Sequence, residues 1–542
     1  MKEIYKLILY PIKFIDKKVL VLLMIFSMLA SILSFPLPIL QKYLFNELIA
    51  EDYRNVFRII IYLLIVFFFQ IIIKSYANYL SFIYEENSYQ CMKKHMLLEF
   101  LSMDFIEADS FEKEYIHNRI DKDSRTVTRY SSSIIKDLVP NTLLFILSVV
   151  YIIYYSKLLL LLSIIILLVI LLLYKLMSKI LYQTNSTFKE EENNLYADFS
   201  ETINNLQLIK INLLEHFENK KFTKRIYEYL KIYKKLVKYT SIFLSCTSSF
   251  QIIITILILC IGAYNVMKGS LTVGDIVTLI AMSSYIIIPI YTIIEVISNY
   301  PEARASESRI HEIVNKTKLN NGVKTIDSIN ALNVNIIQFA YKEHKVIENF
   351  KYEFKKGKIY EIIGENGSGK STLLKIISKL YSTYEGDIMV NGHIDIHDIC
   401  FESHMSHISY IEQMPHLFRG SIADNLFYGD NNYKEEKINH LKKGNLSKFA
   451  ESLFVLPEGL NTCIIDKSGN SISGGEKQKI SIIRELLKDS DVILLDEATN
   501  SLDKNSVKLL YTYLSEIKEE KIIIIVTHQR ENDSYVDEII NI

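Results

Sequence analysis

The chain has 542 residues, five cysteines and a formal net charge of −1 at pH 7. This length exceeds what one hydrophobic core supports, so two or three folding units are expected. A net charge near zero gives no overall field that would attract nucleic acid, and the widely separated cysteines show neither a zinc spacing nor a disulfide framework. We therefore expect no nucleic-acid partner.

The first three hundred or so residues contain six apolar stretches, each long enough to cross a bilayer. A hydrocarbon core of roughly 30 Å requires about 20 apolar residues in a helix. One such stretch could be a buried helix of a soluble domain, but a soluble domain could not cover six of them. The predicted spans lie at about 19–40, 56–83, 134–155, 158–177, 242–266 and 276–297.

Lysine and arginine gather at the N-terminus and in the segments before the third and fifth spans, whereas the intervening loops hold few. By the positive-inside rule, both termini are cytoplasmic and the chain is a multi-pass protein of the cell membrane. The two basic segments are long and read as helical. We expect the membrane helices to continue into the cytoplasm toward the second half of the chain; a pair of solvated loops is the alternative.

Among the polar residues within the predicted spans, four are candidates for a functional role. Gln70, Lys74 and Asn78 recur at four-residue steps, which places them on one helical face, and Glu295 lies late in the sixth span. Such residues either face a cavity for substrate or lie near the cytoplasmic boundary, where a long side chain reaches water. The second explanation is favoured.

A glycine-rich loop follows the apolar run 359–363 and precedes a helix-like run at 373–380. Glycines let the backbone curl around a phosphate, and a helix N-terminus directs N–H groups toward it. Lys370 would reach the β- and γ-phosphates, and the Ser371 hydroxyl would coordinate Mg²⁺. The loop therefore predicts a nucleoside triphosphate site formed by Gly364, Glu365, Asn366, Gly367, Ser368, Gly369, Lys370, Ser371 and Thr372.

A second element of this site is the run 492–497, in which four apolar residues precede two acids. This pattern predicts a buried parallel strand that ends at the ligand-binding edge of a doubly wound sheet. Asp496 is placed to hold the Mg²⁺ shell, and Glu497 to polarise the attacking water.

Another glycine-containing loop, Ser473, Gly474 and Gly475, precedes the helix-like run 480–487. It is also suited to bind an anion at a helix N-terminus. Because one chain rarely needs two phosphate loops for one triphosphate, we expect this loop to complete the site of another subunit.

In these motifs the chain resembles an ATP-binding-cassette (ABC) half-transporter of the exporter type. Gly364–Thr372 is similar to Walker A, Ser473–Gly475 to the signature loop, and Asp496–Glu497 to the end of Walker B. The resemblance implies an α-helical six-span transmembrane domain followed by an α/β P-loop NTPase domain, with the boundary between 1–318 and 319–542.

The resemblance also implies roles for four further residues. Tyr341 would stack on adenine, Gln413 in the Q-loop would assist the metal and catalysis, and Asp503 would belong to the D-loop. His528 would be the switch histidine at the γ-phosphate. The implied cofactors are ATP and Mg²⁺. The signature departs from the usual family pattern at Glu476, where glutamine is common.

For the whole protein, the resemblance implies two cassettes packed head to tail, each ATP lying between Walker A of one and Ser473 of the other. A homodimer is expected, and a dimer with a related half-transporter is the alternative. The expected activity is ATP hydrolysis coupled to export, with a bacteriocin-like peptide as the preferred substrate. Lipid flipping and multidrug export are alternatives, and a membrane-anchored ATPase that senses or confers immunity without moving cargo is an alternative of another class.

Overall fold

The computed structural model describes residues 11, 13, 17–155, 157–316, 318, 321–341, 344–428, 434–442, 444–464, 472–527 and 534–542. The chain forms two compact units. The membrane unit contains Lys113–Asn315 and the chain up to Glu99, and the nucleotide unit contains Phe100–Glu112 and Lys316–Ile542.

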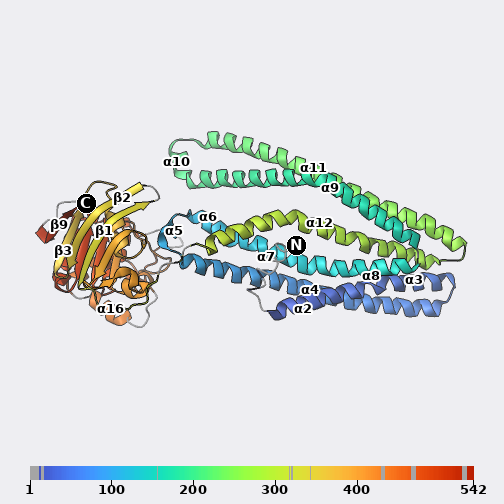
Figure 1. The fold of residues 1–542 in the computed structure, drawn as a ribbon, viewed down its shortest axis with the longest axis horizontal. Coiled ribbons are helices and arrows are strands. Elements are labelled where there is room, and N and C mark those ends of the chain that lie inside the picture. The colour runs from blue at the N-terminus through green and yellow to red at the C-terminus, as the bar shows by residue number, and fades with distance from the viewer. Residues whose placement is uncertain are drawn as a thin grey trace. The chain divides into compact units, whose positions relative to one another are not determined.

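The membrane unit is helical, as predicted (Figure 1). Its longest helices have 48 to 53 residues. At about 1.5 Å per residue, such helices are more than twice as long as a hydrocarbon core of roughly 30 Å, so they extend well beyond a bilayer. The elements are α2 (Lys17–Ser34), α3 (Pro36–Ile49), α4 (Tyr53–Leu101), α6 (Lys113–Asn118), η1 (Arg119–Asp123), α7 (Ser124–Ser133), η2 (Ile134–Leu138), α8 (Val139–Tyr155), α9 (Lys157–Asn204), α10 (Leu206–Ile211), α11 (Glu215–Met267) and α12 (Val273–Val314).

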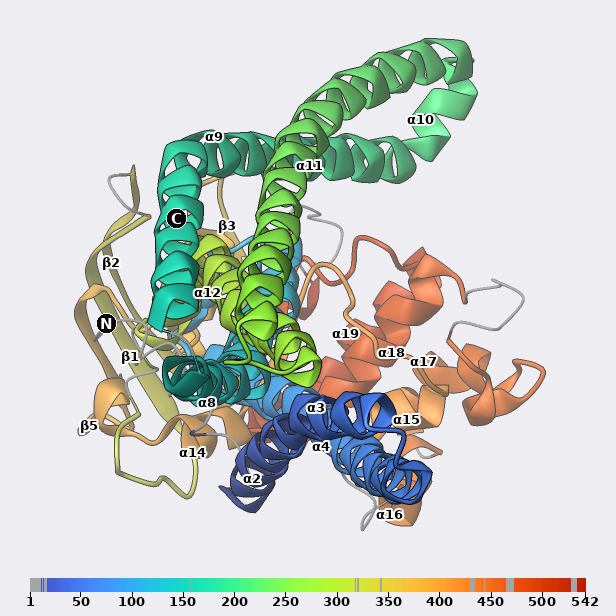
Figure 2. The same ribbon diagram turned by 90° about the vertical axis from the view of Figure 1, so that its right-hand side faces the viewer.

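Five of the six expected spans coincide with helical segments that are long and apolar enough to cross a membrane. The remaining one, 158–177, lies on α9, where several side chains fall outside the described residues. Figure 2 shows that α9 and α11 form a long hairpin with α10 at its tip. The extended helices predicted between the spans are therefore present.

The first span is broken at Phe35, between α2 and α3, where two prolines interrupt the helical hydrogen bonds. Pro38 has no N–H, so the carbonyl of Ser34 lacks its usual helical donor. The Tyr285 hydroxyl of α12 donates to that carbonyl at 3.2 Å. Gln70 of α4 donates to the Ser34 hydroxyl at 2.8 Å, so this predicted polar residue joins two helices.

Helices α3 and α12 also pack closely near the start of α12. A Cβ on Gly274 would lie 2.2 Å from the carbonyl oxygen of Lys42, so only glycine permits this approach. The Gly274 amide donates to Asn46 Oδ1 at 3.0 Å. Beside it, the buried carboxylate of Asp275 forms an ion pair with Lys42 at 2.7 Å. Asp275 also completes a capping box with Thr272, which fixes where α12 begins.

The nucleotide unit contains two sheets. A four-stranded antiparallel sheet has the order β2-β1-β4-β5, and a five-stranded parallel sheet has the order β6-β7-β8-β3-β9. The strands are β1 (Ala331–Tyr341), β2 (His344–Lys355), β3 (Lys358–Ile363), β4 (Glu385–Val390), β5 (Ile394–Asp395), β6 (Ile408–Ile411), β7 (Val492–Asp496), β8 (Ile522–Val526) and β9 (Glu538–Asn541).

The parallel sheet is buried on both faces, which explains why its strands are apolar without alternation. Side chains of β7 and β8 point alternately into two hydrophobic clusters. One cluster contains α13 and the antiparallel sheet, and the other contains α15, α17, α18 and α19. The helices are α13 (Lys370–Ile377), α14 (Phe401–Ser406), α15 (Ile422–Leu426), α16 (Lys434–Leu441), α17 (Gly444–Phe454), α18 (Gly474–Leu486) and α19 (Lys504–Ile517), with short 3-10 turns η3 (Ile396–Asp398), η4 (Gly459–Asn461) and η5 (Lys518–Glu520).

The segment Phe100–Glu112, which includes the short helix α5 (Phe105–Asp109), belongs to the nucleotide unit although it lies far from it in the sequence. The Phe105 ring contacts the ring of Tyr381 with a centroid distance of 6.1 Å. Ser382 donates to the carboxylate of Asp104 at 2.5 Å. The segment is thus held by both apolar and charged contacts.

Candidate nucleotide site

The glycine-rich loop connects β3 to α13 at the carboxyl edge of the parallel sheet, as the sequence predicts. Gly367 and Gly369 have φ values of +86° and +95°, a region that favours glycine. At Gly369 an added Cβ would also lie 2.9 Å from the Ile347 side chain. The loop therefore requires glycine for both its conformation and its packing.

Lys370, the first residue of α13, is buried and lies along the loop. Its ammonium donates to the carbonyl oxygens of Gly364 and Glu365 at 2.9 and 2.8 Å. These contacts hold the positive charge beside the loop that is predicted to receive phosphates. The Ser368 hydroxyl is buried and has no hydrogen-bond partner among the described residues. A buried polar atom without a partner is costly, and a phosphate oxygen would supply one.

Ser371 and Asp496 meet although 125 residues separate them. The Ser371 hydroxyl donates to Asp496 Oδ1 at 2.7 Å, and the Tyr410 hydroxyl donates to Asp496 Oδ2 at 3.0 Å. Burial raises the pKa of Asp496, and the two hydroxyl donors partly oppose that effect. A hydroxyl and a carboxylate are oxygen ligands of the kind that Mg²⁺ prefers, so this pair fits the predicted metal.

Glu497 follows β7 and faces the glycine-rich loop. Its backbone has φ +48°, an unusual conformation for a residue other than glycine. Gln413 donates to Glu497 Oε2 at 2.7 Å, and Asn500 donates to the same oxygen at 3.1 Å. The carboxylate is therefore oriented from two sides.

Tyr341 ends β1 and also belongs to the site. Its hydroxyl lies 3.2 Å from that of Thr372 and donates to the Tyr381 hydroxyl at 3.1 Å. Burial raises the pKa of Tyr341 to about 12, so the phenol stays neutral at physiological pH. The ring remains partly exposed at the site, which fits a stacking surface for a base.

These residues surround a cavity of about 590 Å³. The cavity is large enough for a nucleotide and combines backbone N–H groups, a lysine and a carboxylate, so the residues present fit ATP with Mg²⁺. Its lining consists of Tyr341, His344, Val346, Asn366, Gly367, Gly369, Lys370, Ser371, Thr372, Gln413 and Glu497.

The loop Ser473–Gly475 is not part of this lining. Ser473 caps α18: its hydroxyl accepts from the Glu476 amide, and Glu476 Oε2 accepts from the Ser473 amide and hydroxyl at 2.7 and 2.8 Å. The Ser-x-x-Glu spacing of this capping box is visible in the sequence. Glu476 thus stabilises the start of α18, and the side-chain oxygen of a glutamine could accept the same hydrogen bond from the Ser473 amide.

The predicted residues Gly364, Glu365, Ser368, Asp496 and Asp503 are likewise not part of the lining. Asp503 occupies the N-cap position of α19, and a hydrogen bond with Ser506 holds the pKa of its carboxyl below the usual value. His528 lies outside the described residues. Conversely, His344, Tyr410 and Asn500 take part in the site although no motif in the sequence predicted them. The contact of Tyr410 depends on which strands are neighbours, whereas Asn500 lies only three residues after Glu497 and could have been selected from that spacing.

Comparison with known proteins agrees with this architecture. Residues 20–290, half of the chain, match the family model of the ABC transporter transmembrane region. Residues 347–500 match the ABC transporter model. The fold is similar to that of a bacterial Atm1-family ABC exporter with ATP bound, with a TM-score of 0.83 over 97% of this chain and 93% of the other, at 16% identity.

Among curated relatives, an ATP-dependent lipid A-core flippase of Francisella tularensis subsp. holarctica is 30% identical over 350 residues. That match covers 63% of this chain and 56% of the flippase. A serine protease/ABC transporter B family protein of Dictyostelium discoideum is 30% identical over 61% of this chain and 19% of its own length. The chain spans little more than half of the flippase that it matches. With a transmembrane region and an ATP-binding region in one polypeptide, the chain belongs to the ABC transporter family.

Proposed function

We propose that the chain is an ABC half-transporter that hydrolyses ATP to move a substrate across the cell membrane. One observation carries the proposal: Glu497, oriented by Gln413, lines the same cavity as Lys370 and Ser371. This arrangement sets a carboxylate across from a phosphate-binding loop, as phosphoryl transfer to water requires.

Each residue then has a chemical role. Tyr341 stacks on adenine, and Lys370 neutralises charge on the phosphates, while the loop amides from Gly364 to Thr372 hold the phosphate oxygens. Ser371, Asp496 and Gln413 hold Mg²⁺, which would neutralise charge on the phosphates when bound. Glu497 orients and deprotonates the attacking water. His528 is proposed to contact the γ-phosphate because it matches the switch histidine of the family.

The active form proposed is a dimer, either of two copies or with a related half-transporter. The support is that Ser473–Gly475 forms an anion-suited helix N-terminus outside the cavity of its own chain. A second copy, packed head to tail, would supply that loop to the cavity. Asp503 would lie at the same interface between the two nucleotide units, which we call the seam. Both termini and the nucleotide unit lie in the cytoplasm, where ATP is available; the distribution of lysine and arginine supports this orientation.

The proposed cargo is a lipid. The peptide preference drawn from the sequence has no support in the comparisons, whereas one matched relative is named as a lipid A-core flippase. The same motifs would serve multidrug export, so the cargo depends on the membrane unit and not on the cassette.

One experiment tests activity and cargo together. The purified protein is reconstituted into liposomes with fluorescent phospholipids, and ATP hydrolysis and ATP-dependent lipid translocation are measured. Glu497→Gln removes the base but keeps the size of the side chain, so we expect ATP binding to persist and hydrolysis to fall roughly 10²- to 10⁴-fold, with translocation. Glu451→Gln, at an exposed carboxylate on α17, is the matched control.

If the Glu497→Gln variant hydrolysed ATP at the parental rate, the assignment of the base would be wrong. If the parent hydrolysed ATP but moved no lipid, while peptides entered inside-out vesicles, the lipid proposal alone would fail. Hydrolysis without movement of lipid, peptide or drug would favour a sensing or immunity ATPase.

A further inference from the structure

A face of α11 carries lysines and no acids. Lys231, Lys234, Lys235 and Lys238 recur every three or four residues, so they share one side of the helix. All four side chains are exposed, and none has an ion-pair partner among the described residues. We call these four residues the lysine face.

The lysine face points away from α9. The side of α11 that packs on α9 is defined by ring contacts of Tyr229 and Tyr233 with Phe188, at 5.4 and 5.6 Å. With 3.6 residues per turn, these two tyrosines lie on roughly the opposite side of α11 from the lysines. The four lysines are therefore on the side of α11 that does not pack on α9, and their side chains are exposed.

Arg225, which also lies on α11, differs from these lysines because it forms ion pairs. Arg225 contacts Asp198 at 2.7 Å, Glu228 at 3.4 Å and Glu191 at 3.9 Å. Asp198 and Glu191 of α9 thus pair with Arg225, whereas no acid pairs with the four lysines among the described residues. The lysine face has no internal counter-ion and is open to an external one.

The position of the face along α11 indicates what that counter-ion is. The apolar part of α11 begins within one turn after Lys238. The four lysines extend over about 10 Å of helix, somewhat more than the depth of about 5–8 Å that one lipid headgroup layer occupies. Ser245 and Ser249 continue the same side of the helix into the apolar part, and both are exposed. A cationic surface at the membrane boundary attracts anionic lipids of the cytoplasmic leaflet.

We propose that the lysine face of α11 binds the anionic headgroup of a phospholipid in the cytoplasmic leaflet, with the acyl chains along the apolar part of the helix. The inference rests on the orientation and lipid cargo given under Proposed function, for which it names the headgroup chemistry. Nucleotide and water-soluble peptides fit less well, because the face adjoins an exposed apolar surface that suits acyl chains.

The absence of tryptophan from the sequence allows a direct test. Ile242→Trp places a single tryptophan one turn beyond Lys238, on an exposed position. The full-length protein is reconstituted without ATP into nanodiscs that contain phosphatidylcholine and a minor fraction of brominated lipid. We expect brominated phosphatidylglycerol to quench the tryptophan about tenfold more effectively per molecule than brominated phosphatidylcholine, and added salt to weaken that preference.

Replacement of all four lysines by glutamine should abolish the preference, and replacement by arginine should keep it. A control replaces Lys351, Lys442, Lys448 and Lys508 by glutamine; these lysines are exposed in the nucleotide unit and have no ion-pair partner among the described residues. This control should behave like the parent. Equal quenching by the two lipids in the parent would overturn the proposal. Loss of the dimer in the fourfold glutamine variant, with no lipid preference in the parent, would show that the face binds a second copy instead.

Because the assay needs no ATP, its outcome is independent of hydrolysis and transport. A lipid preference in a protein that moves no lipid would leave the binding site standing and remove only the proposed cargo. Conversely, lipid transport without any preference at Ile242→Trp would leave the proposed function standing and remove this site.

Discussion

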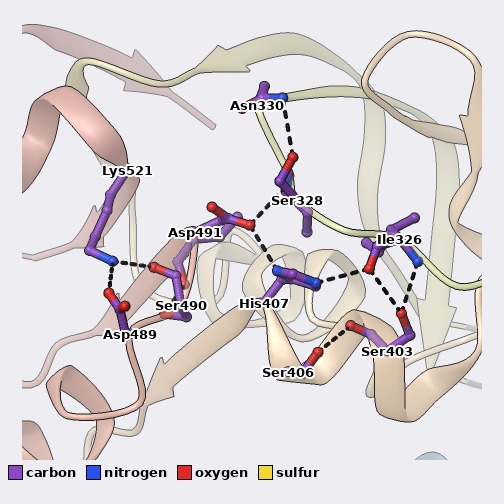
Figure 3. Close-up of polar contacts among 12 residues, drawn as sticks. Ile326, Ser328, Asn330, Ser403, Ser406, His407, Asp489, Ser490, Asp491 and Lys521 are labelled. Carbon is purple, nitrogen blue, oxygen red and sulfur yellow. Dashed lines mark hydrogen bonds and ion pairs between the residues drawn. The ribbon is translucent and has the colours of Figure 1, made fainter.

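Asp491 has three hydrogen-bonding partners in the nucleotide unit. It accepts from Lys356 at 2.9 Å and from the Ile329 amide at 2.9 Å, and its Oδ2 lies 2.8 Å from His407 Nδ1. Figure 3 shows His407 between Asp491 and the carbonyl of Ile326. Burial alone raises the pKa of Asp491, but the hydrogen bonds outweigh it and hold the pKa below the usual value.

A lowered carboxyl pKa means that the folded state gains stability above the ordinary aspartate pKa of about 3.9 and loses it as the pH falls through the folded value. We therefore expect Asp491→Asn to reduce the free energy of unfolding at pH 7 by about 1.5–3 kcal/mol. The melting temperature should fall accordingly. The difference from the parent should shrink below about pH 4. Thermal unfolding of the purified protein across pH 7 to 3 would measure it.

Asp489→Asn is the matched control, since the Asp489 side chain is 93% exposed and its backbone has φ +54°, which asparagine tolerates. This control should be nearly neutral. A difference between Asp491→Asn and the parent that stayed constant down to pH 3 would show that the charge of Asp491 is not what stabilises the fold.

Among elements, the pairing of α3 with α12 depends on the buried ion pair between Lys42 and Asp275. Removal of one partner leaves an uncompensated buried charge, at a cost of about 3–5 kcal/mol. We expect Lys42→Met to lower the melting temperature in detergent and Lys42→Met/Asp275→Asn to recover part of that loss. Lys268→Met, at an exposed lysine with no carboxylate partner among the described residues, serves as the control. A double variant no more stable than Lys42→Met would argue against the ion pair.

The elements also show what a sequence can predict. The glycine-rich loop, Asp496 and the helical spans were predictable because each depends on a short motif or on hydropathy along the chain. The contacts of Tyr410 with Asp496 and of Gln413 with Glu497 were not, because they require β6 to lie beside β7, and these strands are far apart in sequence. The membership of Phe100–Glu112 in the nucleotide unit likewise depends on long-range packing that leaves no local pattern.

For the whole molecule, the dimer proposal makes a prediction about mixed assemblies. Two variants are made in a Glu497→Gln background. Lys370→Ala should remove ATP occlusion because it damages the phosphate loop. Ser473→Asp should also remove it, because it places a negative charge at the opposing loop while it keeps a helix cap. A dimer that contains one copy of each should regain occlusion, because one of its two seams combines an intact Lys370 with an intact Ser473. Two affinity tags isolate that dimer, and bound ATP is counted.

Each variant examined as a homodimer is the internal control. A mixed dimer that occluded no more ATP than either homodimer would contradict the shared seam. Full occlusion by Ser473→Asp alone would show instead that each chain holds its nucleotide without help from another.

The membership of Phe100–Glu112 in the nucleotide unit has a practical consequence for dissecting the protein. The polypeptide crosses between the two units three times, after Glu99, Glu112 and Asn315. Proteolysis or truncation at the last crossing alone would therefore free no intact ATPase fragment. A soluble fragment that began near residue 321 would leave the surface around Tyr381 without its Phe105 cover, so recombinant production should include a fused or co-expressed peptide spanning 100–112.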